Sequence, residues 1–86
     1  MKTAIIIPAY SAASTLNLLL ARLLEFAPKN DIIVIDDGSS DCTAEAAKLS
    51  GVELIIHQHN KGKGAALRSG FELALQKGCE AVITID

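Results

Sequence analysis

The sequence predicts a three-layer, Rossmann-like α/β fold, β-α-β-α-β-α-β, with a four-stranded parallel sheet between helices. Short continuous apolar runs recur along the chain, as in strands that are covered on both faces. Segments with helical periodicity separate these runs, and strands that alternate with helices form parallel sheets with right-handed crossovers. No linker, repeat or low-complexity segment interrupts the pattern, so residues 1–86 are expected to form one small domain.

The first strand is predicted at the apolar run Ala4 to Ile7, which ends at Pro8-Ala9-Tyr10. A helix follows, because apolar residues recur there with i, i+3, i+4, i+7 and i+8 spacing. These residues are Leu16, Leu19, Leu20, Leu23 and Leu24. Ser11 or Ser14 is expected to cap the start of this helix, and Pro28 lies just beyond its end.

The second strand is predicted at residues 32–35 and runs into the turn Asp36-Asp37-Gly38. Ser40 or Asp41 is expected to cap the second helix, which ends at Gly51. The third strand is predicted at residues 52–56. These elements extend the alternation of strand and helix without a gap.

The third helix is predicted from about Gly64 to Lys77, with Gly78 as the residue that ends it. The face expected to be buried carries Leu67, Phe71, Ala74 and Leu75. Residues 80–85 form the predicted fourth strand. A strand order of 3-2-1-4 would place the topological switch point between the first and fourth strands, and ligands bind at such points.

The loops at the carboxyl ends of the strands hold the polar residues that can bind a ligand. Asp36 and Asp37 point to opposite sides of their strand, so one is expected to brace the turn while the other faces the crevice. A turn with a helix cap and no ligand is the alternative. Tyr10 can lie under a planar base, although a single aromatic residue also serves as packing.

Residues 60–64, Asn-Lys-Gly-Lys-Gly, form a glycine-rich loop that opens the third helix. Backbone N–H groups and the positive end of a helix suit an anion there, and Lys63 adds a cation that suits a diphosphate. The spacing is not that of a P-loop. His57 and His59 have no carboxylate or cysteine nearby in sequence to complete a metal site, so they are predicted to lie at a solvated strand end.

Composition excludes several classes of partner. The net charge is -2, basic residues are scattered and Trp is absent, so no nucleic-acid partner is expected. The apolar run before Pro8 is too short for a membrane span or a signal peptide, which predicts a cytoplasmic protein. Cys42 and Cys79 are expected to be reduced thiols.

Four segments occur in an informative order: IIIPAY, VIDDGSSDCTAEAA, HNKGKGAALRSGF and VITID. Together they resemble the family 2 glycosyltransferases, which include the dolichyl-phosphate mannose synthases and related bacterial enzymes. The resemblance covers essentially the whole chain. It implies the N-terminal, nucleotide-binding half of a GT-A fold and a nucleoside-diphosphate sugar as the ligand.

The resemblance assigns the nucleotide to residues of three loops: Pro8, Ala9, Tyr10, Asp36, Asp37, Gly62, Lys63 and Gly64. Tyr10 and the backbone before it would flank the base. Asp37 would accept a hydrogen bond from the base, and Asp36 would support the loop. The segment around Lys63 would lie toward the diphosphate.

The resemblance also makes Asp86 the first carboxylate of the family's DxD-type metal motif, which would bind Mg²⁺ or Mn²⁺ in the parent enzyme. The family usually has Asn-Glu after the tyrosine, where this chain has Ser11-Ala12-Ala13. No residue of the chain matches the family's general base. We therefore expect no catalytic residue in this chain, and no sugar transfer by the chain alone.

Two other functions compete with this interpretation. The fourth strand should lie at a sheet edge, which predicts a self-associating scaffold that forms a homodimer through this strand. A receiver-like phosphoacceptor module also combines paired aspartates with a loop lysine. Against that alternative, the third strand ends with Ile56-His57 and has no aspartate at its end.

Overall fold

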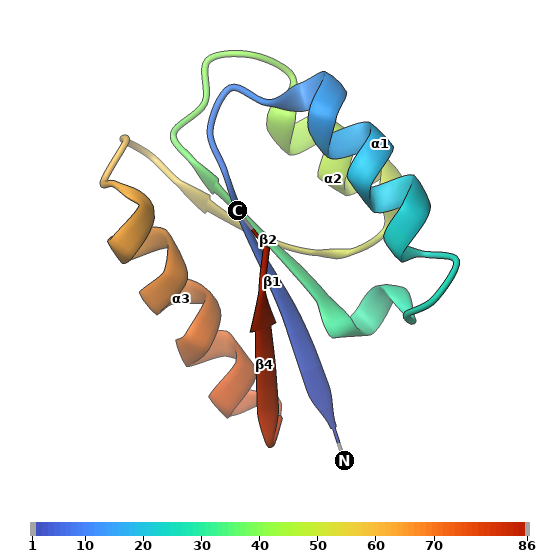
Figure 1. Cartoon of the computed structure of the whole chain (residues 1–86). Coiled ribbons are helices and arrows are strands. Elements are labelled where there is room, and N and C mark those ends of the chain that lie inside the picture. The colour runs from blue at the N-terminus through green and yellow to red at the C-terminus, as the bar shows by residue number, and fades with distance from the viewer. Residues whose placement is uncertain (1, 86) are drawn as a thin grey trace.

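The structure, a computed structural model, describes residues 2–85 and confirms the predicted α/β fold (Figure 1). All four strands are parallel, in the order β3-β2-β1-β4. The strands are β1 (Thr3–Ala9), β2 (Ile32–Asp37), β3 (Glu53–His57) and β4 (Ala81–Thr84). The helices are α1 (Ala13–Leu23), α2 (Thr43–Ser50) and α3 (Lys63–Gln76), and a short 3-10 turn, η1 (Lys29–Asp31), precedes β2.

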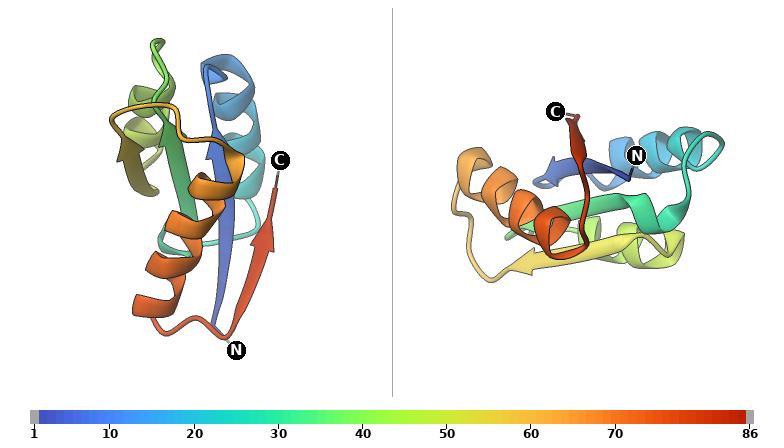
Figure 2. Two further views of the ribbon diagram at one scale, coloured as in Figure 1. Left: turned by 90° about the vertical axis from the view of Figure 1, so that its left-hand side faces the viewer. Right: turned by 90° about the horizontal axis from the view of Figure 1, so that it is seen from below.

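Helices cover the sheet unequally. α1 and α2 lie together on one face, and α3 lies alone on the other (Figure 2). The α1–α2 face buries large side chains, including Leu16 and Leu20 of α1 against Ile7 and Val34 of the sheet. Helices cover both faces of the central strands, and their branched side chains are buried on both sides. For this reason the sequences of these strands are continuous apolar runs.

The α3 face is built from small residues. Ala66, Gly70 and Ala74 are its buried positions, whereas the predicted Phe71 and Leu75 are 40% and 75% exposed. A Cβ atom on Gly70 would lie 2.6 Å from Cγ2 of Ile6. The predicted face was therefore wrong in part, because close approach of α3 to the sheet favours small side chains over large ones.

The start of α1 also differs from the prediction. Neither Ser11 nor Ser14 occupies the N-cap position, which falls on Ala12 and has no side-chain cap of its own. The hydroxyl of Thr43 accepts the N–H of Ala12 at 3.1 Å, and Asp41 accepts the N–H of Ala13 at 3.5 Å. Side chains that are distant in sequence thus accept the first N–H groups of the helix. A rule that considers only neighbouring residues does not predict such a cap.

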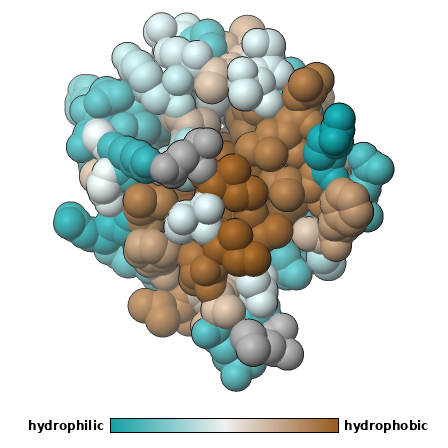
Figure 3. Space-filling view, in the orientation of Figure 1, coloured by the Kyte–Doolittle hydropathy of each residue, from teal (hydrophilic) through white to brown (hydrophobic). Residues whose placement is uncertain are grey.

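β4 is the last strand at one edge of the sheet. Its residues pair with β1, from Thr3 opposite Ala81 to Ile6 opposite Thr84. Within residues 2–85 no strand pairs with its outer side. Val82 and Ile83 are exposed there, and Figure 3 shows hydrophobic surface over this part of the molecule.

Candidate functional site

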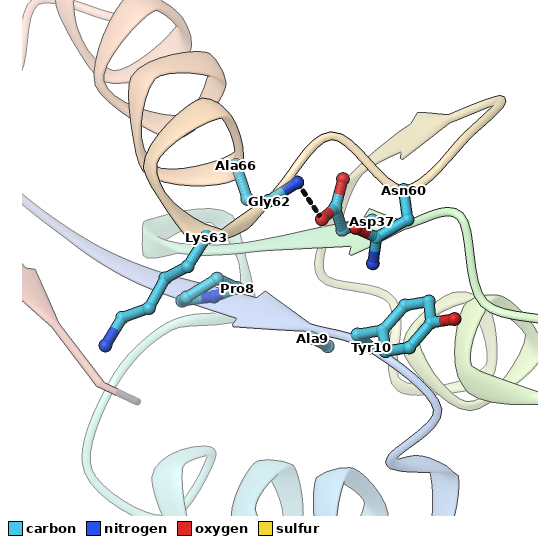
Figure 4. A pocket seen from close by; sticks show the side chains of 8 residues that line it. All are labelled: Pro8, Ala9, Tyr10, Asp37, Asn60, Gly62, Lys63 and Ala66. Carbon is cyan, nitrogen blue, oxygen red and sulfur yellow. Dashed lines mark hydrogen bonds between the residues drawn. The ribbon is translucent and has the colours of Figure 1, made fainter.

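A pocket of about 380 Å³ opens at the carboxyl edge of the sheet, between the end of β1 and the start of α3 (Figure 4). Six of the residues assigned to the nucleotide line it: Pro8, Ala9, Tyr10, Asp37, Gly62 and Lys63. They come from three loops that are far apart in sequence. The order β3-β2-β1-β4 brings these loops together, because the carboxyl ends of parallel strands share one edge.

The other predicted residues lie elsewhere. Asp36 is buried outside the pocket lining, and its Oδ1 accepts the N–H of Ser39 at 3.0 Å, so it braces the turn after β2. Gly64 lies in the first turn of α3, outside the pocket lining. Asp86, the predicted metal ligand, lies outside the described residues. Asn60, from the predicted glycine-rich loop, and Ala66 also line the pocket, although neither was among the residues assigned to the nucleotide.

Asp37 is the most constrained polar group of the pocket. Its Oδ1 accepts the N–H of Lys61 at 2.9 Å, and its Oδ2 accepts the N–H of Gly62 at 2.8 Å. Nδ1 of His57 lies 2.8 Å from the same Oδ1. A single buried carboxylate thus ties the end of β2 to the end of β3 and to the loop that enters α3.

The prediction for His57 was wrong. Its ring is buried rather than solvated, with Nδ1 against Asp37 and Nε2 at 2.8 Å from Oγ of Ser69. His59 is exposed, as predicted. The pairing of His57 with Asp37 follows from register, since the two residues are directly opposite each other on β3 and β2. Ser69, on α3, had no distinguishing signal in the sequence.

The hydrogen bonds of Asp37 favour the ionised form of its carboxyl group. Burial alone would raise the pKa of this carboxyl group. Other interactions outweigh burial and lower the pKa below its ordinary value of 3.8. They are the hydrogen bond from His57, the hydrogen bonds from the N–H groups of Lys61 and Gly62, and the electrostatic attraction of His57. Asp37 is therefore an ionised hydrogen-bond acceptor at neutral pH.

The opposite wall of the pocket is the loop from β1 to α1. Tyr10 is 55% exposed and presents its ring at the mouth of the pocket. The next residue, Ser11, has a φ of 49°, and its N–H donates to Oγ of Ser39 at 2.8 Å. Side chains after β2 thus hold this wall through its backbone, at the positions Ser11-Ala12-Ala13.

Gly38 packs the turn after β2 against the α3 side of the pocket. Its φ of +77° favours glycine, and a Cβ atom there would lie 2.5 Å from the backbone N of Asn60. The turn after β2 therefore packs backbone against backbone on the loop that enters α3. Only a residue without a side chain fits this contact.

The start of α3 makes the floor of the pocket suitable for an anion. Gly62 is the N-cap residue, with a φ of 97°, and Lys63 begins the helix. Both line the pocket. The N–H groups and positive dipole end of a 14-residue helix favour a negatively charged ligand at this place.

The described residues show neither a metal centre nor a membrane span. Among residues 2–85 there is no group of three or more His, Cys, Asp or Glu side chains arranged to hold a metal ion. Over the same residues, no helix has the length and apolar character needed to cross a bilayer. Cys42 and Cys79 are free cysteines.

A similar fold occurs in a mannosyltransferase from Pyrobaculum calidifontis, solved in complex with GDP-Man and Mn²⁺. The two chains superpose with a TM-score of 0.66 at 22% identity, over 85% of this chain and 24% of the other. Together with the strand order, this match shows a fold of the GT-A type.

The chain belongs to glycosyl transferase family 2, whose family model matches residues 4–86. It is 33% identical to an undecaprenyl-phosphate mannosyltransferase of Micrococcus luteus, covering 100% of this chain and 37% of the relative. It is also 33% identical to a polyprenol monophosphomannose synthase of Mycolicibacterium smegmatis, covering 99% of this chain and 34% of the relative. The chain thus spans about a third of the length of these relatives.

Proposed function

We propose that residues 1–86 form the nucleotide-sugar-binding part of a family 2 glycosyltransferase whose parent reaction transfers a sugar to a lipid-phosphate or saccharide acceptor. The observation that carries this proposal is that one pocket holds Tyr10, Asp37 and the start of α3 together. Its volume of about 380 Å³ lies within the range of small-molecule sites. The aromatic ring and the hydrogen-bond acceptor match a nucleotide base. The anion-binding start of the helix matches a diphosphate.

On the base side, Asp37 has room for one more donor. A carboxylate offers about four acceptor positions, and Lys61, Gly62 and His57 use three of them. Two of the three are on Oδ1, so the remaining position is on Oδ2. A base N–H would donate to this oxygen while Tyr10 flanks the ring of the base.

On the phosphate side, the chain leaves space close to its backbone. A Cβ atom on Gly62 or Gly64 would meet nothing within 4 Å, so a diphosphate can approach the first turn of α3. Lys63 supplies positive charge at this place. The divalent cation of the parent reaction, Mg²⁺ or Mn²⁺, would be held by Asp86 together with the phosphates and would stabilise the leaving diphosphate.

The chain alone is expected to bind the nucleotide sugar without transferring the sugar. Inverting transfer needs a base that deprotonates the acceptor, and no residue of this chain is assigned that role. Incubation with nucleotide sugars and lipid-phosphate or saccharide acceptors tests this expectation, and clear turnover would contradict it. We place the protein in the cytoplasm, where nucleotide sugars are the expected ligands.

Nucleotide binding itself is tested by titrating the chain with UDP, GDP and their sugars, with and without Mn²⁺, while amide NMR shifts are recorded. We expect shifts at Tyr10, Asp37 and Lys63. The variant Lys48→Ala, which removes an exposed lysine of α2 outside the pocket lining, is a matched control for Lys63→Ala and should bind as the wild type does. Unchanged spectra at all three pocket residues would contradict a nucleotide site.

The edge strand supports a second function, self-association. Val82 and Ile83 of β4 are 38% and 53% exposed beside an unpaired strand edge in the described part of the chain. We expect two copies to join through β4 into one continuous sheet. Light scattering should then show a dimer at micromolar concentration and a monomer for Ile83→Lys. A wild-type monomer would exclude this function.

A further inference from the structure

We propose that His57 and Ser69 are positioning residues that orient the Asp37 carboxylate and, through it, the loop that enters α3. Neither side chain lines the pocket. Their role would therefore be exerted entirely through Asp37. The part of this inference that concerns ligand affinity rests on the proposed nucleotide site.

The hydrogen bonds form a closed circuit. It runs from Ser69 on α3 to His57 at the end of β3, and from there to Asp37 at the end of β2. Asp37 then binds the N–H groups of Lys61 and Gly62, and the next residue begins α3 again. Such a ring resists motion of the loop, because the two loop N–H groups bind a carboxylate that His57 and Ser69 hold in place.

The strand register places the circuit on the α3 side of the sheet. Asp37 and His57 are opposite each other on neighbouring parallel strands. Two residues earlier, Ile35 and Ile55 belong to the apolar cluster beneath α3. Since side chains two apart on a strand face the same side, both polar groups extend that cluster toward the pocket.

The chemistry of the partners determines which nitrogen of His57 carries hydrogen. The Asp37 carboxylate is ionised and only accepts hydrogen bonds, so Nδ1 of His57 must be the donor. In the neutral ring Nε2 is then an acceptor, and the hydroxyl of Ser69 donates to it. In the protonated ring Nε2 donates to the same hydroxyl oxygen. Ser69 therefore keeps the ring in one orientation in both charge states.

This arrangement gives the two oxygens of the Asp37 carboxylate different roles. His57 and Lys61 occupy Oδ1, which leaves Oδ2 with the Gly62 N–H and one open position toward the pocket. Loss of the Nδ1 donor would let the carboxylate rotate. The open acceptor position and the two N–H contacts of the loop would then be lost together.

Two substitutions of His57 separate positioning from general destabilisation. In His57→Asn the side-chain amide can replace Nδ1 and still donate to Asp37, whereas in His57→Gln the amide reaches the position of Nε2. The first readout, taken without ligand, is hydrogen exchange of the Lys61 and Gly62 amides. We expect His57→Gln to accelerate it at least tenfold, His57→Asn to change it by less than about threefold, and Ser69→Ala to fall between them.

The second readout is the dissociation constant of UDP or GDP, which should rise in the same order among folded variants. The third is the ¹⁵N spectrum of His57 in the wild type, which should show the Nδ1–H tautomer at a pH where the ring is neutral.

Equal exchange in both His57 variants, or an Nε2–H tautomer, would overturn the proposal. If His57→Gln does not fold, unchanged exchange in Ser69→Ala overturns it instead. If the wild type binds no nucleotide, the proposed function fails, while the exchange and ¹⁵N readouts still test the circuit.

Discussion

The loop that enters α3 and the loop that enters α1 form the two walls of the pocket, and both donate backbone N–H groups to side chains of residues 36–43. On the α3 wall the acceptor is the buried carboxylate of Asp37. On the α1 wall the acceptors are Ser39, Asp41 and Thr43. Thr43 is buried but neutral, whereas Asp41, the charged acceptor, is exposed.

This difference indicates which wall is rigid. A buried ionised acceptor that loses its partners leaves unsatisfied groups, whereas water replaces lost partners at an exposed acceptor. The α3 wall should therefore be the fixed side of the pocket. The α1 wall, which carries the half-exposed Tyr10, should be the side that adjusts to a ligand.

The largest effect is expected for Asp37→Ala. It removes the acceptor of the Lys61 and Gly62 N–H groups and leaves Nδ1 of His57 without its partner. We expect the free energy of unfolding to fall by about 3 kcal/mol, measured by urea denaturation. A loss no larger than that for Asp41→Ala would contradict the contrast between the walls.

A smaller effect is expected for Gly38→Ala, which tests the backbone contact between the turn after β2 and the loop that enters α3. The added Cβ would lie 2.5 Å from the backbone of Asn60, at a φ of +77°. We expect a loss of roughly 2 kcal/mol in the free energy of unfolding. Gly64→Ala is the matched control, because its Cβ meets nothing within 4 Å, and this variant should gain about 0.5–1 kcal/mol.

Acid should weaken the α3 wall through the same carboxylate. The pKa of Asp37 is lower in the folded state than its ordinary value of 3.8, so the unfolded chain binds the proton more readily. The stabilisation is complete above that value and is lost as the pH falls through the folded-state pKa. Urea denaturation from pH 6 down to pH 2.5 should show this loss, with a flatter profile for Asp37→Asn; parallel profiles would be evidence against it.

The smallest effect is expected for Asp41→Ala. Asp41 accepts the N–H of Thr43 at 3.0 Å and the N–H of Ala13 at 3.5 Å, and its hydrogen bond with the Thr43 hydroxyl is the main cause that lowers its pKa. Asp41 is exposed, so the loss of its carboxylate costs less than the loss of a buried one, and the urea midpoint should move less than for Asp37→Ala. Faster hydrogen exchange should be confined to the starts of α1 and α2, and exchange at Gly62 should be unchanged.

Local patterns predicted most of the fold. Apolar runs identified every strand, and glycines marked helix ends, as at Gly51 with its left-handed φ of 77°. The failures are specific. The buried face of α3 shifted to Ala66, Gly70 and Ala74, because the distance between helix and sheet is set by the packed residues of both. The apolar periodicity of one segment gives no information about that distance.

By itself the sequence determined the α/β class, the order of elements and the three loops that carry the pocket residues. The reason is that strand periodicity, helix periodicity and turn chemistry act over a few residues. Only the tertiary structure decided which partners surround Asp37. The register of β2 and β3 buries His57 against Asp37, and α3 then adds Ser69. These contacts join residues 12 to 25 positions apart, where packing rather than local pattern selects the partner.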